Sequence, residues 1–251
     1  MGDLLSNSGC KDYSDKITPN ILQRLQMSQI LEMLKLQQKL NDTTNGANWE
    51  NGVTKNGKPI DWRRCIYLEA AELVESYPWK HWKNINSSPD YENIKIELVD
   101  IWHFVMSEAL RVYKIENRGS IERLSRTIEA TSGYEALVKG EQKKRDYYAQ
   151  IELIEEVIKV LFCSNDINEL IDSFLYTASQ LGVDLQRLYA LYIGKNILNK
   201  FRQDHGYKEG SYIKEWNGIE DNVIMQTILA QESNITPDSL YQKLKEAYPQ
   251  N

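Results

Sequence analysis

Residues 91–114 limit the fold of this chain more than any other segment. They contain neither proline nor glycine, and they follow Ser88-Pro89-Asp90, a sequence that favours a helix start. Large apolar side chains fill the segment on nearly every side, at Ile94, Ile96, Leu98, Val99, Ile101, Trp102, Phe104 and Val105. A helix of this kind is buried among other helices. The segment therefore predicts the central helix of a bundle.

Apolar residues at helical spacing predict further helices around it. These helices cover residues 21–40, 62–77, 147–163, 166–181, 184–204, 219–232 and 236–247. Asn-Gly pairs in residues 42–60 predict a loop, which can hold a short hairpin, whereas the charged segment 115–145 gives no clear element. No segment has a convincing strand pattern. The fold class is therefore all-α, a helical bundle of about eight helices.

Length and composition fit a single domain. The chain has 251 residues, of which 41% are hydrophobic, as is typical of a globular protein. We expect residues 20–251 to form one all-α domain, which begins at the helix start Thr18-Pro19-Asn20. The polar residues 1–19 are expected to form a flexible N-terminal arm.

Charge and cysteine usage narrow the class of partners. The net charge of -6 argues against binding to a nucleic acid polymer, which needs a basic face, but allows a small anionic substrate. Cys10, Cys65 and Cys163 are widely spaced, which argues against a disulfide framework or a zinc site. No apolar run approaches the ~20 residues that span a bilayer, and no secretory signal is visible. We expect a cytoplasmic protein with reduced thiols and no membrane association.

Two acidic pairs are the strongest functional signal. Glu69 and Glu72 are three residues apart in one predicted helix, and Glu97 and Asp100 are three apart in the central helix. Residues at this spacing share a helix face, so both pairs can point to one place. Acidic pairs on helices are usually solvated surface charges, but the apolar neighbours of Glu97 and Asp100 make burial without a cation costly. Converging oxygen ligands predict a Mg²⁺ site that acts on phosphate.

Two further polar sets recur at helical spacing. Gln37 and Asn41 lie four residues apart, and their amides offer the donor and the acceptor that read a base edge. Lys195, Asn199 and Arg202 share one face of a later helix, where Lys and Arg suit a phosphate chain. From spacing alone, these sets are also compatible with an exposed polar stripe and a basic helix end.

Taken together, these blocks resemble the dimeric dUTPases of the all-α NTP pyrophosphatase superfamily, and most closely their bacterial branch. The matching blocks are Glu69-Ala-Ala-Glu72, Glu97-Leu-Val-Asp100, LKLQQKLND at 34–42, WKHWKN at 79–84, IWHF at 101–104 and GKNILNKFRQDHGYKEGSY at 194–212. The resemblance covers residues 21–114 and 185–245, and residues 115–165 add little to it.

The resemblance implies a catalytic domain that hydrolyses dUTP to dUMP and pyrophosphate, with dUDP as a further candidate substrate. It places two or three Mg²⁺ ions at Glu69, Glu72, Glu97 and Asp100. One of these carboxylates is expected to act on the attacking water, and our candidate is Glu69. The family comparison favours attack at the β-phosphorus. It also implies a homodimer in which the partner completes each site.

The resemblance also assigns the substrate contacts. The expected phosphate ligands are Lys195, Asn199, Arg202, Tyr207 and Lys214, with Lys208 in the same loop and Asn222 near the sugar. Gln37 and Asn41 are expected to read the uracil. Phe104 follows Asp100 by one helical turn, so we expect it to stack on the base, with Trp79, Trp82 and His103 as further candidate walls. Aromatic residues at helical spacing are more often core residues, and His103 is equally compatible with a buried core histidine.

Three other functions remain open from the sequence. The first is a related house-cleaning pyrophosphatase that acts on dCTP or a modified nucleotide. The second is a ferritin-like di-iron bundle, although that site needs Glu-x-x-His pairs and only Asp100-Ile-Trp-His103 comes near one. The third is a helical regulatory protein that binds a nucleotide without cleaving it.

Overall fold

The computed structural model describes residues 28–83, 87–231 and 235–249, which form ten α-helices, a 3-10 helix and one two-stranded hairpin. The helices are α2 (Gln29–Asn45), η1 (Trp49–Asn51), α3 (Trp62–Glu75), α4 (Tyr91–Ile115), α5 (Ile121–Glu129), α6 (Ser132–Lys139), α7 (Tyr147–Cys163), α8 (Ile167–Gln180), α9 (Leu185–Asp204), α10 (Asp221–Gln231) and α11 (Pro237–Ala247). Strand β1 (Glu215–Trp216) pairs antiparallel with β2 (Ile219–Glu220). The predicted all-α class is confirmed. The predicted arm and the helix start at residues 18–20 lie outside the described residues.

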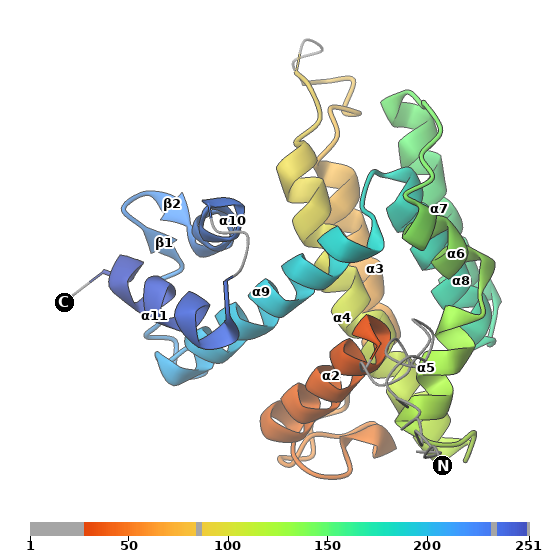
Figure 1. Ribbon diagram of the computed structural model, residues 1–251, viewed down its shortest axis with the longest axis horizontal. Helices are drawn as coiled ribbons and strands as arrows, with labels where there is room; N and C mark the ends of the chain where they lie inside the picture. The colour runs from red at the N-terminus through yellow and green to blue at the C-terminus, as the bar shows by residue number, and fades with distance from the viewer. Residues whose placement is uncertain (1–27, 84–86, 232–234, 250–251) are drawn as a thin grey trace, which may run out of the picture.

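Helix α4 lies at the centre of the fold, as its apolar sequence predicts. It packs against α2, α3, α5, α8 and α9 (Figure 1). Asp90 caps its N-terminus, because the Asp90 carboxylate accepts a hydrogen bond from the Asn93 amide at 3.0 Å. Helix α3 runs along α4 and starts in the same way, with Asp61 accepting from the Arg64 amide at 3.0 Å. The two acidic pairs are thus carried by two helices that pack on each other.

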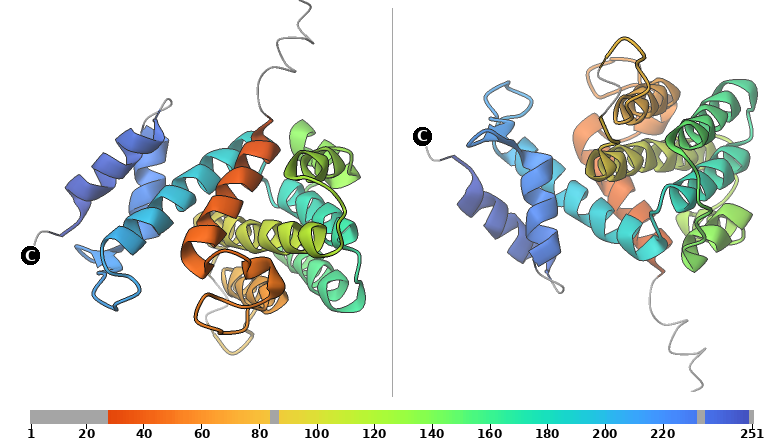
Figure 2. Two further views of the ribbon diagram at one scale, coloured as in Figure 1. Left: turned by 90° about the horizontal axis from the view of Figure 1, so that it is seen from below. Right: turned by 90° about the horizontal axis from the view of Figure 1, so that it is seen from above.

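Helix α9 connects two hydrophobic cores. The main core surrounds α4, and in it Trp102 stacks on Phe174 with 5.5 Å between ring centroids. The second core surrounds Phe201 near the end of α9, where the rings of Trp216 and Tyr248 pack on it. Figures 1 and 2 show α9 leaving the helices around α4 and ending beside α10, α11 and the hairpin. One face of α9 therefore lies between the two cores.

The helices predicted from periodicity agree well with the structure. Those predicted over 62–77, 91–114, 147–163, 166–181, 184–204, 219–232 and 236–247 are confirmed, with described ends within two residues of the prediction. The segment 115–145, for which no element is predicted, holds α5 and α6. Both helices are short, and each buries few large apolar side chains, such as Leu124 and Ile128 in α5 and Leu137 in α6.

Two predictions about irregular segments are wrong. Helix α2 continues beyond its predicted end at residue 40 and stops at Gly46, whose φ of 93° a side chain would rarely adopt. The expectation of no strand misses β1 and β2. Their turn consists of Asn217 and Gly218, with φ of 54° and 81°, which is the left-handed backbone of a two-residue hairpin. The short hairpin allowed within residues 42–60 is present as a single bridge between Val53 and Pro59.

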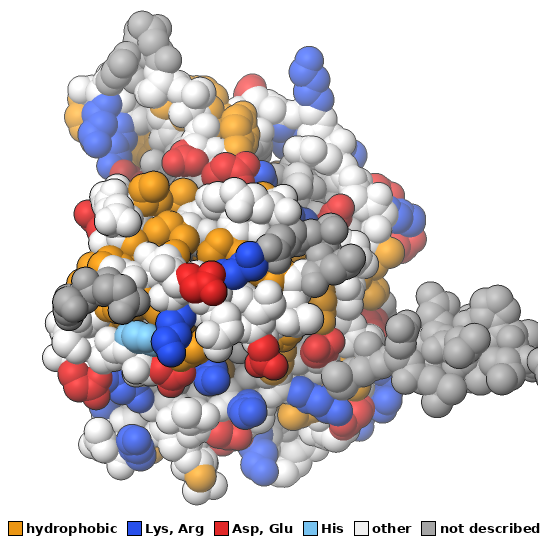
Figure 3. Space-filling view, turned by 60° about the vertical axis from the view of Figure 1, so that its left-hand side comes forward, with side chains coloured by type: hydrophobic (Ala, Val, Ile, Leu, Met, Phe, Trp, Pro, Cys, Tyr) orange, Lys and Arg blue, Asp and Glu red, His pale blue; other side chains and the backbone are white. Residues whose placement is uncertain are grey.

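The surface carries charges of both signs. On the face shown in Figure 3, acidic and basic side chains are interspersed among apolar ones rather than gathered by sign. Within the described residues, no helix has the length and apolar character needed to cross a membrane.

Candidate active site

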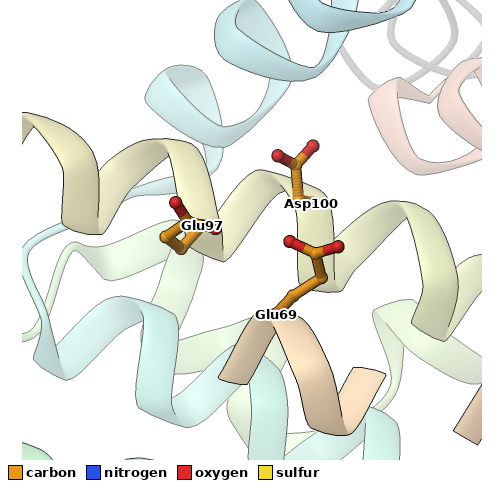
Figure 4. Close-up of side chains that lie close together, drawn as sticks. All are labelled: Glu69, Glu97 and Asp100. Atoms are coloured by element: carbon orange, nitrogen blue, oxygen red, sulfur yellow. The ribbon is translucent and has the colours of Figure 1, made fainter. Parts of the chain in front are cut away.

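Three carboxylates converge where α3 packs on α4. Glu69 comes from α3 and Glu97 and Asp100 from α4, and one oxygen of each lies within 4.8 Å of the others (Figure 4). The three-residue spacing puts Glu97 and Asp100 on one face of α4, and packing brings Glu69 to that face. The structure thus joins three of the four carboxylates that the sequence singles out.

Glu72 lies at the solvent edge of this cluster. It is exposed, one helical turn after Glu69 on α3. Its charge nevertheless raises the pKa of both Glu69 and Glu97. Glu72 is therefore near enough to act on the same cation or on a group bound to it.

The cluster has an excess of negative charge. Burial raises the pKa of Glu69 to about 7 and that of Glu97 to about 8, and the charge of Asp100 adds to both shifts. The Lys195 ammonium acts in the opposite direction, with its Nζ 2.7 Å from Asp100 Oδ2. One ammonium cannot balance this group of carboxylates, so a divalent cation among them would be strongly stabilised.

The basic face of α9 meets the start of α10. Lys195 Nζ donates to Asn222 Oδ1 at 2.9 Å, and Arg202 donates to the same oxygen at 3.3 Å. Arg202 also donates to both carboxylate oxygens of Asp221 at 2.8 Å each and to Asn199 Oδ1 at 3.2 Å. The residues predicted to contact phosphate on α9 thus form one hydrogen-bonded cluster with Asn222.

Asp221 is a site residue that the sequence does not reveal. It is fully buried, and it also accepts a hydrogen bond from the Tyr212 hydroxyl at 2.8 Å. Although burial acts to raise the pKa of Asp221, the hydrogen bonds and charge of Arg202 lower it. Arg202 is therefore already paired with an anion, and a bound phosphate would have to share its guanidinium.

Gly194 allows α10 to come this close to α9. A Cβ atom at Gly194 would lie 2.6 Å from both Leu229 Cδ1 and Met225 Sδ. Both atoms belong to side chains of α10, so a Cβ at position 194 would require these side chains to move. The absence of a side chain at Gly194 thus lets the two helices pack closely here.

The loop after α9 crosses to the end of α2. The Tyr207 ring lies 5.9 Å from the Arg202 guanidinium carbon, and Lys208 Nζ donates to the Thr44 carbonyl at 3.4 Å. Lys214 is exposed, and its carbonyl accepts from the Asp221 amide at 3.0 Å. Of the loop residues expected at the phosphates, the structure places the side chain of Tyr207 against Arg202, whereas the other two reach the surface.

A neutral hydrogen-bond network holds the two amides of α2. Gln37 Nε2 donates to Ser107 Oγ at 3.0 Å and to Asn41 Oδ1 at 3.3 Å, and Asn41 Nδ2 donates to Ser107 Oγ at 3.0 Å. Gln37 Oε1 accepts from the Tyr192 hydroxyl at 3.1 Å and lies 2.7 Å from His103 Nδ1. All five side chains are buried. Gln37 is predicted to read the base, but its amide groups already form hydrogen bonds to other side chains of the protein.

His103 belongs to this network rather than to the carboxylates. Burial lowers its pKa to about 4, so the ring is neutral at pH 7. Because Nδ1 faces a carbonyl oxygen, it carries the proton, and Nε2 is a buried acceptor that has no partner among the described residues. The described metal-ligand group contains carboxylates alone, which argues against a ferritin-like di-iron site.

A comparison with protein families decides what these residues belong to. The model of the dUTPase family matches residues 29–207, which is well over half of the chain. The chain belongs to the all-α dimeric dUTPase family. Its activity is that of a dUTP diphosphatase, and the family generally uses a divalent metal. No curated protein shows significant sequence similarity to the chain.

The family match differs in extent from the resemblance seen in the sequence. It runs without a break through residues 115–165, which add little to the motif comparison. It ends at Tyr207, before Lys214 and Asn222. This part of the dUTPase, from the hairpin to α11, nevertheless supplies Asp221 and Asn222 to the cluster around Arg202.

The aromatic residues of this dUTPase are more dispersed than expected. Phe104 stacks on Trp62 with 5.9 Å between centroids and packs on the main core. Trp82 is 62% exposed and makes its ring contacts in the described chain with Trp79 and His81. Of the two, only Phe104 belongs to a helix that carries site carboxylates, α4, which holds Glu97 and Asp100.

Proposed function

We propose that this dUTPase cleaves dUTP where α3, α4 and α9 meet, giving dUMP and pyrophosphate. The observation that carries the proposal is the convergence of Glu69, Glu97 and Asp100 beside Lys195. We assign Mg²⁺ binding to these three carboxylates and to Glu72 at their edge, with two or three ions in the complex with substrate.

The donor set fits this metal. Every ligand is a carboxylate oxygen, which suits Mg²⁺ better than a soft transition metal. The raised pKa values of Glu69 and Glu97 reflect negative charge that a cation would relieve. When bound, Mg²⁺ supplies positive charge that neutralises phosphate oxygens and makes water a better nucleophile.

The protein's own residues orient the two reactants. We assign the attacking water to Glu69, because its carboxylate is more accessible than that of Glu97, which is 7% exposed. Attack at the β-phosphorus would leave dUMP as the leaving group. On the other side of the phosphate chain we place the cations and amides of the α9 face and of the loop that follows, namely Lys195, Asn199, Arg202, Tyr207, Lys208, Lys214 and Asn222. Positive charge there stabilises the charge that develops on the phosphates.

The base lies at the other end in this proposal. Gln37 and Asn41 form the uracil site in this proposal, Asn41 through its free amide groups and Gln37 through its hydrogen bond to Asn41. Phe104 would stack on the base, with Trp82 as an outer wall. The bond that is cleaved joins the α- and β-phosphates, and dUDP also contains this bond. We therefore include dUDP as a substrate. We propose neither a nucleic acid polymer nor a membrane as a partner, and the net charge of -6 argues against the first.

We further propose that the enzyme is a homodimer in the cytoplasm. The family to which it belongs is described as dimeric. Cys65 and Cys163 are free thiols, which fits a reducing compartment. We treat residues 20–251 as one catalytic domain, because α9 contributes to both hydrophobic cores.

A substrate panel tests the proposal. The purified protein would be assayed for pyrophosphate release from dUTP, dTTP and dCTP and for phosphate release from dUDP, each with Mg²⁺ and with EDTA. We expect Mg²⁺-dependent cleavage of the uracil nucleotides. Equal turnover of all three triphosphates would contradict uracil specificity and favour a broader house-cleaning enzyme.

A variant pair tests the assigned ligands. Glu97→Gln keeps the size of the side chain but removes its charge, so we expect turnover to fall by at least about a thousandfold. Glu92→Gln is the matched control, because Glu92 is on the same helix but exposed at its first turn. Full activity of Glu97→Gln would overturn the metal site.

A further inference from the structure

Ser107 is the point from which the buried amide network takes its direction. Its hydroxyl donates to the His103 carbonyl at 2.8 Å, the usual bond of a helical serine to the residue four positions earlier. A hydroxyl has a single proton. With that proton used, Ser107 Oγ can only accept from Gln37 and Asn41, each 3.0 Å away.

This fixes which way both amides face. Each must turn its NH₂ group towards Ser107, so the Gln37 carbonyl must face Tyr192 and His103. The second N–H of Gln37 then donates to Asn41 Oδ1 at 3.3 Å. Rotating either amide by half a turn would place a carbonyl against an oxygen that has no proton to give, in a site sealed from water.

Asn41 therefore offers one fixed pair of groups. Of its two N–H groups, one is used on Ser107, and of its two oxygen lone pairs, one is used by Gln37. One donor and one acceptor remain, in an order that cannot be exchanged. Uracil presents O4 as an acceptor next to N3–H as a donor. Cytosine presents the reverse order, an amino donor next to N3 as an acceptor, so a freely rotating amide would pair with either base.

We propose that Ser107 is a positioning residue that determines base specificity: by locking the direction of the Gln37 and Asn41 amides, it admits uracil and rejects cytosine. Tyr192 supports the same direction from α9, because its hydroxyl lies 3.1 Å from Gln37 Oε1 and shares its single proton between that oxygen and the Met33 carbonyl, 3.0 Å away. This inference rests on the proposed base site at Gln37 and Asn41 and extends it to residues that need not touch the base.

The test compares kcat/KM for dUTP and for dCTP in the wild type and in Ser107→Ala. We expect the dUTP/dCTP ratio to fall by at least about tenfold in the variant, because the amides become free to rotate. The gain should lie in KM for dCTP, while kcat for dUTP stays within about threefold, since no carboxylate is changed. An unchanged ratio in a folded, active Ser107→Ala enzyme would overturn the inference.

Two further variants separate positioning from general loosening. Ser179→Ala is the matched control, because Ser179 is also a buried helical serine whose hydroxyl faces backbone carbonyls, that of Glu141 at 2.6 Å and that of Ala136 at 3.0 Å. It should lower the melting temperature without moving the ratio, and an equal shift of the ratio would count against Ser107. If Ser107→Ala does not fold, Tyr192→Phe decides. We expect it to lower the ratio by about threefold, and no change would overturn the inference.

Calorimetric binding of dUMP and dCMP separates this inference from the proposed function. A wild type that binds dUMP in preference to dCMP but does not cleave dUTP would refute the proposed reaction and leave the Ser107 test valid as a binding ratio. A wild type that neither binds nor cleaves uracil nucleotides would refute both.

Discussion

The two ends of the proposed site are built from different interactions. At the base end, Gln37, Asn41 and Ser107 are neutral and buried, and their hydrogen bonds all lie inside the main core. At the phosphate end, Lys195 and Arg202 are cations held by Asp100 and Asp221. The side chains of the base end are already held in place by hydrogen bonds to one another before a substrate binds. The phosphate end holds ion pairs whose partners must be shared when the substrate and metal bind.

This difference matches the two tasks. Telling one base from another needs donors and acceptors of fixed direction. A rigid neutral network provides them without burying a charged group. Binding a triphosphate needs positive charge, and a buried cation without an anionic partner is unstable. Carboxylates of the site therefore neutralise these cations in the absence of substrate. We expect mutations at the phosphate end to affect turnover and stability together, and mutations at the base end to affect selectivity.

The largest effect is expected from Lys195→Met. This change removes the ammonium that contacts Asp100 and Asn222, so the phosphate chain of the substrate loses a charge-assisted contact. We expect kcat for dUTP to fall by about 10²–10³-fold, as for other buried groups that stabilise developing charge. Lys200→Met is the control, since Lys200 is exposed on the same helix above the Tyr241 ring. Activity within threefold of the wild type would show that Lys195 only balances the carboxylates.

Asp221→Asn tests whether the ion pair at the phosphate end stabilises the fold. The change leaves Arg202 buried with one charged partner fewer, and removing one member of a buried ion pair costs about 3 kcal/mol. We expect a loss of this order in chemical denaturation, with a smaller loss in the double variant with Arg202→Met than the two single losses combined. Asp238→Asn, at an exposed position in the first turn of α11, should change stability by less than about 0.5 kcal/mol. Additive losses would mean that the two side chains do not act as a pair.

The carboxylate cluster predicts a dependence of stability on pH in the metal-free protein. In the folded state the pKa of Glu69 is about 7 and that of Glu97 about 8, against 4.5 without these surroundings. Between about pH 4.5 and 8 the folded state therefore binds more protons than the unfolded state, so stability falls as pH rises. In EDTA we expect the free energy of unfolding, measured by urea denaturation, to fall steadily between pH 5 and 8.

Mg²⁺ should remove most of this slope, because it favours the ionised carboxylates, and should stabilise the protein more at pH 8 than at pH 5. Glu97→Gln should flatten the slope in EDTA, since one of the two shifted groups is gone. A slope that is the same with and without Mg²⁺ would place the metal elsewhere.

Sequence periodicity was enough to place the functional helices, because their acidic, amide and basic residues repeat at helical spacing. It predicted that Glu97 and Asp100 share a face, and the structure brings Glu69 to that face. Periodicity does not predict the hydrogen-bond partners at either end of the site, Ser107 at the base end and Asp221 at the phosphate end. Ser107 is one serine in an apolar helix, and Asp221 is one acid among many, so only their tertiary neighbours distinguish them.

The same limit applies to the fold. Helices α5 and α6 are not predicted, because their few apolar residues give too short a pattern. Packing defines them instead, α5 mainly against α2 and α6 mainly against α8. Gln37 shows the limit most directly. Its spacing from Asn41 correctly puts the two amides together, but spacing does not show that the protein already uses the Gln37 amide in full.

The smallest effect is expected from Lys208→Ala, which probes how far the phosphate end depends on the loop after α9. Lys208 Nζ reaches the Thr44 carbonyl at 3.4 Å across an exposed surface, and such a contact contributes little in water. We expect KM for dUTP to rise by about threefold with kcat unchanged, and stability to change by less than about 0.5 kcal/mol. Lys58→Ala, in the exposed segment after α2, should change neither constant. A fall of kcat by more than tenfold in Lys208→Ala would show that Lys208 leaves Thr44 and contacts the phosphates during turnover. The loop would then belong with Lys195 and Arg202 among the cations that change partners when the substrate binds.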